Sequence, residues 1–322
     1  MDLTSRIRDA AGGTPTWATV TRVTDPAGAP TFETFHLDDS ATTVGFWPAS
    51  VVKLYTAIAS FELMNDLDLP ADAILDFQHG ETGRGWVSDC VRTPAEMCHN
   101  IFLESANEDY TLQLRWCGID HLNTRFFTAA NGFAHTALMR GYVHTRPHRY
   151  APDEPQRVRV WGLPDPDGDG PAPLLHVREH TWSGTSYSAA LGQTIIDERI
   201  ANCSPTGDMA ECMRRVMFHE RLPEAERFDL TPAQLTLLRE GAGGWVGMRN
   251  TSWTWAWTDS IHDVLPDACF YHKSGNISDY HLDLVYVSDA ASDTHFIAAV
   301  ATESPEKAPC QRIFKAIAAA MR

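Results

Sequence analysis

The chain of 322 residues contains very little lysine. Only Lys53, Lys273, Lys307 and Lys315 occur, although there are 26 basic residues in all. Acidic residues outnumber basic ones, with 42 Asp and Glu, and the net charge is −16 at pH 7. A surface this acidic repels nucleic acid and anionic membranes. We therefore expect neither as a partner, and expect a small molecule or a peptide instead.

Long apolar runs are also absent from the sequence. The N-terminal residues MDLTSRIRDAAGG contain no apolar core of the signal-peptide type. No later segment approaches the ~20 consecutive apolar residues that a membrane-spanning helix needs. These absences predict a soluble, cytoplasmic protein, or a periplasmic or secreted one if a leader has been trimmed away. We expect a monomer.

Motifs that would hold a metal are missing as well. The seven cysteines are odd in number and spread out, without a C-x-x-C pair, which favours reduced thiols over disulfides or a zinc site. The segment DPDGDG, residues 165–170, resembles the start of a calcium loop, but position twelve would be His176 instead of glutamate. We expect no metal and no cofactor.

Strand patterns lie at both ends of the chain. Residues 16–23 and 31–37 are β-branched and aromatic and are separated by the turn-rich TDPAGAP, which predicts a hairpin. Three further strand patterns, at residues 268–275, 280–288 and 294–302, follow near the C-terminus. We expect the two ends to meet in one antiparallel sheet.

Helical patterns occupy the middle of the chain and its last residues. They cover residues 46–64, 94–104, 108–116, 118–132, 204–218, 231–240 and 310–321. Residues 145–185 are rich in Pro, Gly and Asp and predict a long loop, with one hairpin formed by RVRVW and LLHVR. The sequence thus predicts a sheet lobe of residues 1–48 and 242–322. A helical lobe, residues 49–241, would be inserted into it and would contain the loop.

Lys53 lies in an apolar helical pattern, FWPASVVKLYTAIASFELM, three residues after Ser50. Residues at this spacing share a helix face. A serine hydroxyl needs a base to become a nucleophile, and a buried lysine can act as one because burial favours its neutral form. Arginine stays protonated and cannot replace it. The alternative is a chance S-x-x-K in which Lys53 reaches solvent, but the apolar helix offers little route for that.

Two further motifs follow in order. Ser105-Ala106-Asn107 falls in a break between two helical patterns, where it can present a hydroxyl and an amide together. Lys273-Ser274-Gly275 falls in a strand pattern, where the glycine would let a ligand lie close to the backbone. Each motif is weak alone, but the ordered set S-x-x-K, S-x-N and K-S-G is a strong indication of one active site.

With these motifs the sequence resembles the penicillin-recognising serine enzymes, the class A β-lactamases and D-alanyl-D-alanine peptidases. The segments EMCHNIFLESANEDYTLQLRWCGIDHLNTRFF and NCSPTGDMAECMRRVM add to the resemblance. It implies an α/β (α+β) fold in which a five-stranded antiparallel sheet, flanked by helices, packs on an inserted all-helical lobe. The active site would lie between the two.

The resemblance also implies a role for each motif residue. Ser50 would be the acylated nucleophile and Lys53 its base. Ser105 would relay a proton to the leaving nitrogen. The remaining residues would bind substrate. Asn107 would bind an amide, and Lys273 and Ser274 would bind a carboxylate at the strand where Gly275 lets a ligand lie close. The backbone N–H groups of Ser50 and Asn276 would bind the oxyanion.

The sequence departs from the family in its second motif and in the loop that follows it, which looks longer here over residues 145–185. Class A β-lactamases have a glutamate on a loop after the second motif that activates the deacylating water. The corresponding segment here, TALMRGYVHTRPHRYAPDEPQ, has no E-x-x-N pattern, and Glu154 and Glu179 are the nearest candidates. The middle residue of the second motif is Ala106, where class A enzymes have aspartate.

Three functions are therefore compatible with the sequence. The first is a serine hydrolase that cleaves an amide, a β-lactam or a D-amino-acid-type peptide, through an acyl-Ser50 intermediate. The second is an esterase, amidase or acyltransferase of small-molecule metabolism with the same Ser-Lys site. The third is a penicillin-binding sensor that deacylates slowly. In each case we expect a substrate or ligand that bears a carboxylate.

Overall fold

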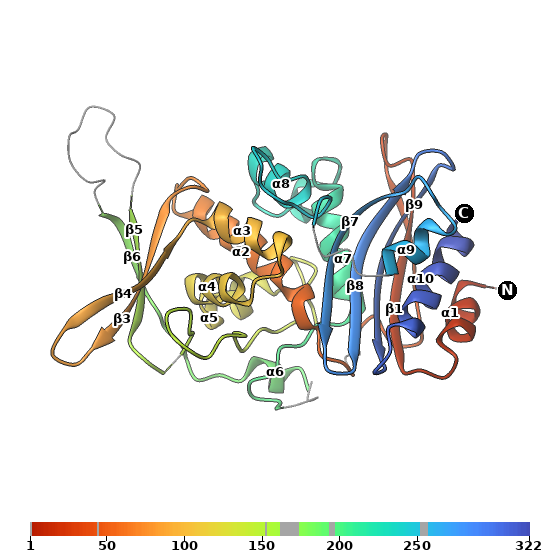
Figure 1. Cartoon of the computed structure of the whole chain (residues 1–322). Coiled ribbons are helices and arrows are strands. Elements are labelled where there is room, and N and C mark those ends of the chain that lie inside the picture. The colour runs from red at the N-terminus through yellow and green to blue at the C-terminus, as the bar shows by residue number, and fades with distance from the viewer. Residues whose placement is uncertain (1, 44, 152, 162–173, 193–196, 252–256) are drawn as a thin grey trace.

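The structure is a computed structural model, and it describes residues 2–43, 45–151, 153–161, 174–192, 197–251 and 257–322. Its larger sheet is antiparallel and joins both ends of the chain in the order β2-β1-β9-β8-β7 (Figure 1). The strands are β1 (Thr16–Thr24), β2 (Thr31–His36), β7 (Cys269–Ile277), β8 (Tyr280–Asp289) and β9 (Thr294–Glu303). The predicted hairpin and the three predicted C-terminal strands are thus confirmed.

Both faces of this sheet are covered by helices. Strand β8 turns Leu282 and Leu284 toward one apolar core and Val285 and Val287 toward another, so its residues read as nearly continuously apolar. Helix α7 (Thr206–Met217) packs on the first face. The second face is covered by α1 (Leu3–Ala11), α9 (Trp257–His262) and α10 (Ala308–Met321) (Figure 1). Helices α1 and α9 were not predicted from the sequence.

The remaining helices build the part of the molecule beside strand β7. Helix α2 (Lys53–Asp66) is at its centre and is buried along almost its whole length. It contacts α3 (Pro94–Leu103) and α4 (Asn107–Cys117), and α8 (Pro232–Arg239) packs on α3. The helix predicted for residues 118–132 is shorter than expected. It consists of α5 (Ile119–His121) and a π-helical turn (Leu122–Phe126), because Phe126, Phe127 and Phe133 turn into one aromatic cluster.

A second sheet, which the sequence analysis missed, lies at the far side of these helices. Its order is β4-β3-β5-β6, with β3 (Ile74–Glu81), β4 (Gly85–Arg92), β5 (Gln156–Trp161) and β6 (Leu174–Glu179) (Figure 1). The hairpin predicted inside residues 145–185 is present as β5 and β6. This hairpin is part of a larger sheet, because β5 pairs along its length with β3. The inserted part therefore contains a sheet in addition to its helices.

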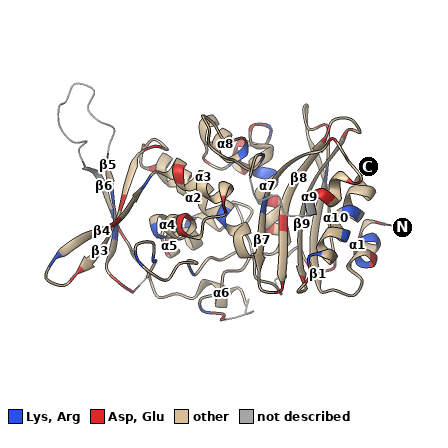
Figure 2. Ribbon diagram, in the orientation of Figure 1, with Lys and Arg blue, Asp and Glu red and all other residues tan. Residues whose placement is uncertain are grey.

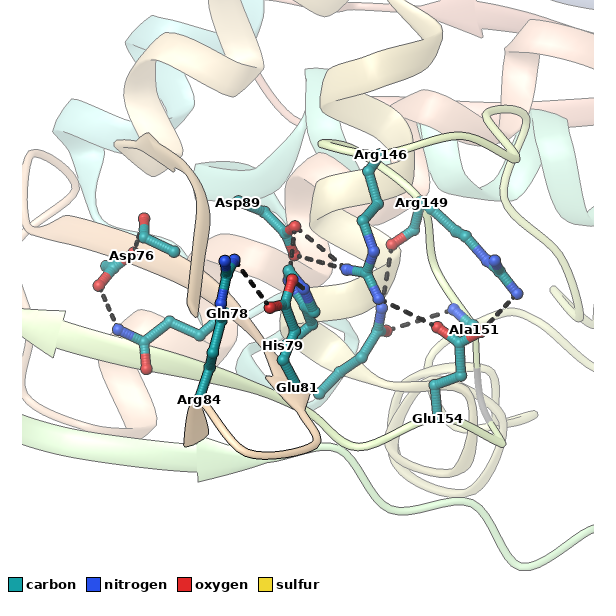
Figure 3. Close-up of polar contacts among 12 residues, drawn as sticks. Asp76, Gln78, His79, Glu81, Arg84, Asp89, Arg146, Arg149, Ala151 and Glu154 are labelled. Atoms are coloured by element: carbon teal, nitrogen blue, oxygen red, sulfur yellow. Dashed lines mark hydrogen bonds and ion pairs between the residues drawn. The ribbon is translucent and has the colours of Figure 1, made fainter. Parts of the chain in front are cut away.

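Ionic contacts join this second sheet to helix α4 and to the loop before β5, and Figure 3 shows those between Asp89 and Arg146 of the loop. The carboxylate of Asp89, on β4, is almost completely buried. It accepts hydrogen bonds from Arg115 of α4 at 2.8 Å and from Arg146 of the loop at 3.1 Å. His79, on β3, lies 2.8 Å from the same carboxylate. We call these four residues the Asp89 cluster.

Two further observations concern predictions made from composition. None of the helices that the structure describes is long and apolar enough to cross a membrane. All seven cysteines are free thiols, and Cys98, Cys117, Cys203, Cys212 and Cys310 are buried.

The shorter helical elements are α6 (Tyr187–Ala190) and the 3-10 turns His219–Arg221 and Glu224–Glu226.

Candidate active site

Ser50 lies on a 3-10 turn, η1 (Ala49–Val52), that leads directly into α2. Pro48 precedes this turn, and Ala49 has a positive φ of 44°. Strand β7 packs against the turn at Gly275. A Cβ added to this glycine would lie 3.1 Å from the backbone nitrogen of Ser50 and 3.1 Å from the Cβ of Ala49. The glycine is therefore needed for the close approach of β7 to Ser50.

Lys53 begins α2 and is completely buried. Its Nζ donates hydrogen bonds to Asn107 Oδ1 at 2.6 Å, to Ser105 Oγ at 3.3 Å and to the Ser105 carbonyl. The hydrogen bonds of Lys53 are thus formed with the second motif and not with the hydroxyl of Ser50. Burial lowers the pKa of Lys53 well below its ordinary value, and the charge of Lys273 lowers it further. Glu108 and Asp109 oppose this shift.

Ser105 connects the two lysines. It lies between α3 and α4 with a positive φ of 55°. Its hydroxyl accepts a hydrogen bond from Lys273 Nζ at 3.0 Å in addition to the longer one from Lys53. Lys273 also donates to the carbonyl of Ser274 at 3.0 Å. Burial lowers the pKa of Lys273 to about 7, against the opposing influence of the Asp283 carboxylate.

A pocket of about 440 Å³ opens above these groups. The sequence-predicted residues Ser50, Ser105, Asn107, Ser274 and Asn276 line it. Lys53, Lys273 and Gly275 are buried next to wall residues without lining the pocket themselves. The structure thus brings all eight predicted residues to one place.

Sequence reasoning missed the other side chains of this pocket, which are Trp47, Ala49, Glu104, Arg140, Tyr142 and Ile277. Tyr142 donates a hydrogen bond to the carbonyl of Ala49 at 2.7 Å, and its ring centre lies 5.7 Å from Lys53 Nζ. Burial raises the pKa of Tyr142 to about 12. Neighbours of the motifs, such as Trp47 and Glu104, could have been suspected from the sequence. Nothing in the sequence marked Arg140 or Tyr142.

The two glutamates considered for deacylation lie elsewhere. Glu154 forms ion pairs with Arg149 at 2.7 Å and with Arg146 at 3.3 Å, beside the Asp89 cluster (Figure 3). Glu179 ends β6, opposite Arg157. Neither is among the described residues that line the pocket. Glu104 is the acidic residue of that wall, and it is exposed.

Charges are interspersed over the ribbon as a whole (Figure 2). The described part of the chain contains no group of three or more His, Cys, Asp or Glu that could hold a metal ion. The aspartates of the DPDGDG segment lie outside the described residues.

Comparison with known proteins relates the fold to class A β-lactamases. A β-lactamase from Sphaerobacter thermophilus superposes with a TM-score of 0.56 at 16% identity, over 99% of this chain and 96% of that one. A class A β-lactamase from Bacteroides cellulosilyticus gives 0.57 at 13% identity, over 100% and 97%. A β-lactamase from Xanthomonas campestris gives 0.54 at 16%, over 99% and 96%.

The other comparisons found nothing: no family model and no curated protein matches the chain. At these low identities the likeness is one of fold. The chain has a mixed α/β structure with antiparallel sheets flanked by helices, as in β-lactamases.

Proposed function

We propose that this chain is a serine hydrolase of the β-lactamase-like superfamily that cleaves an amide through an acyl-Ser50 intermediate. One observation supports this most strongly. A fully buried lysine, whose pKa is lowered, lies at the base of the pocket that contains Ser50, hydrogen-bonded to Ser105 and Asn107. The substrate would be a β-lactam or a D-amino-acid-type amide.

The acylation step follows from the proposed roles. Neutral Lys53 takes the proton of the Ser50 hydroxyl as the oxygen attacks the substrate carbonyl. The backbone N–H groups of Ser50 and Asn276 stabilise the oxyanion of the tetrahedral intermediate. When that intermediate collapses, the C–N bond breaks and the leaving nitrogen receives a proton from Ser105, which Lys53 replenishes. The hydrogen bond between Ser105 Oγ and Lys53 Nζ supports this relay.

Substrate binding would use the remaining residues. Lys273 is charged below about pH 7 and, with Ser274, would hold a carboxylate at the edge of β7. Asn107 would hold an amide of the substrate. Water would then release the acyl group, with Lys53 as base.

A second function is favoured by the composition of the pocket wall. The acidic residue of the wall is the exposed Glu104. The described part of the loop after α5 brings Tyr142, and not a carboxylate, close to Ser50, and the hydroxyl of Tyr142 already donates to Ala49. Without a carboxylate from this loop to activate water, an acyl group would persist on Ser50. This would suit an esterase or amidase of small-molecule metabolism, an acyltransferase, or a slowly deacylating sensor.

Intact-protein mass spectrometry with a penicillin tests the proposal. We expect a mass increase of one penicillin at Ser50, no adduct in Ser50→Ala, and normal labelling in the exposed control Ser183→Ala. Loss of the adduct over time separates turnover from lasting acylation. Full labelling of the Ser50→Ala protein would refute Ser50 as the nucleophile.

A further inference from the structure

The loop that follows α5 brings a cationic side chain into the pocket that none of the sequence motifs contains. Arg140 lines the pocket together with Ser50 and Trp47. Its guanidinium carbon lies 5.5 Å from the centre of the Trp47 ring. It is a third basic group of this site, after Lys53 and Lys273.

Arg140 has no carboxylate partner among the described residues. Its Nη2 donates to His144 at 3.2 Å, and its buried Nε has no hydrogen-bond partner. The arginines of the Asp89 cluster, in contrast, are paired with Asp89. In a chain of net charge −16 an arginine without a carboxylate partner, facing a pocket, has donors left for a ligand.

The backbone that presents Arg140 is firmly held. Asn202, which is buried, accepts a hydrogen bond from the Arg140 N–H at 3.0 Å and donates one to its carbonyl at 3.1 Å. The buried hydroxyl of Tyr110 donates to the same carbonyl at 2.9 Å. The side chain therefore starts from a fixed position, with one face supported by an indole ring, and does not behave as a mobile surface arginine.

We infer that Arg140, stacked on Trp47, is a second anion-binding subsite, and that the substrate is a dianion with one carboxylate at Lys273 and Ser274 and another at Arg140. This inference rests on the proposed function of the pocket and specifies its substrate class. A guanidinium binds a carboxylate through two parallel hydrogen bonds, which a neutral group cannot match.

The test measures equilibrium binding and needs no turnover. Succinate, glutarate and adipate are each titrated calorimetrically beside their monoamides, which have the same length but one charge fewer. At least one diacid should bind roughly 10- to 100-fold more tightly than its monoamide, the range for a hydrogen bond to a charged group.

Variants then assign this preference to a residue. Arg140→Gln should abolish the preference for the diacid. Arg140→Lys should retain part of this preference, because the charge remains but the two parallel hydrogen bonds of the guanidinium are lost. Arg84→Gln, at the exposed turn between β3 and β4, is the control and should retain it fully. Urea unfolding of each variant checks that the fold persists.

Three outcomes would overturn the inference: no preference for any diacid, no binding of any diacid at millimolar concentration, or a preference that survives in Arg140→Gln. The proposed function fails separately, if penicillin still labels the Ser50→Ala protein. The two ideas can thus be rejected independently.

Discussion

The hydroxyl of Ser105 accepts a hydrogen bond from Lys273 Nζ at 3.0 Å, across the boundary between the helices and the edge of the large sheet. The same hydroxyl lies 3.3 Å from Lys53 Nζ. One serine therefore links a lysine of α2 to a lysine of β7. Because Lys273 lowers the pKa of Lys53, their charges are coupled, and a change at either lysine will be felt at the other.

Replacing Lys53 with arginine tests whether it acts as a base. Arg is always protonated, so Lys53→Arg should slow acylation of Ser50 by at least ~100-fold, the low end of general-base effects. The measurement is the single-turnover labelling rate with a chromogenic cephalosporin. Lys315→Arg, an exposed change in an ion pair with Asp263, is the matched control. Near-normal labelling by the Lys53→Arg protein would show that only the charge matters.

The pKa of Lys273, about 7, predicts how binding depends on pH. The lysine is charged below this pKa and becomes neutral above it. The KM for a carboxylate substrate should therefore rise as pH increases from 6 to 9, by up to ~10-fold per pH unit at the alkaline end. In Lys273→Arg the charge persists and the KM should stay nearly constant. A wild-type KM that does not change over this range would contradict a carboxylate-binding role for Lys273.

Burial of Lys273 should also reduce stability. Its pKa in the folded protein lies below its ordinary value of 10.5, so folding releases a proton at pH 7 to 10.5 and stability rises with pH across this window. Lys273→Met removes the penalty and should raise the free energy of unfolding at pH 7 by at least ~1 kcal/mol. Urea unfolding should show this gain shrinking toward pH 10. A gain that is independent of pH would indicate packing instead.

Deacylation should be slower than acylation with β-lactams. Neither Glu154 nor Glu179 lies at the pocket, so a chromogenic cephalosporin should give a burst followed by slow turnover. Glu154→Gln and Glu179→Gln should leave both phases unchanged. Fast turnover without a burst, lost in either variant, would identify a conventional deacylating glutamate. Glu104→Gln tests the acidic residue of the wall in the same assay.

Asp89 should contribute strongly to stability through its cluster. Asp89→Asn leaves the buried guanidinium of Arg115 without its counter-charge, which typically costs ~3–5 kcal/mol. The expected result is a lower midpoint of urea unfolding. Asp38→Asn, in the exposed ion pair with Arg8, should cost less than ~1 kcal/mol. Equal effects of the two substitutions would argue against the importance of the cluster.

The sequence predicted those parts of the fold that have a local signal. The strands around Thr19 and Leu284 and the helix of Lys53 are periodic, and the three motifs mark one pocket because their residues are chemically unusual. The second sheet was missed because strands β3 and β4, around Phe77 and Asp89, were not recognised. The pairing of β3 with β5 is also a contact between distant segments.

The site was predicted incompletely for a related reason. Tyr142 and Arg140 reach the pocket through tertiary contacts, those of Asn202 and Tyr110 with the Arg140 backbone and of Tyr142 with Ala49. No motif or periodicity records such contacts. A loop residue of this kind can be assigned to the site only from the three-dimensional structure, in which the loop lies beside the nucleophile.

The way this loop is fastened has a consequence for its entropy. Between Phe126 and Gln156 the described chain contains no helix or strand, yet it is pinned at Ala137 by a bridge to Cys203 and at Arg146 by Asp89. Such fixed points divide one long loop into shorter spans, and each short span has less conformational entropy left to lose. A ligand that binds to Arg140 or Tyr142 would therefore contact a wall whose conformational entropy was already lost during folding.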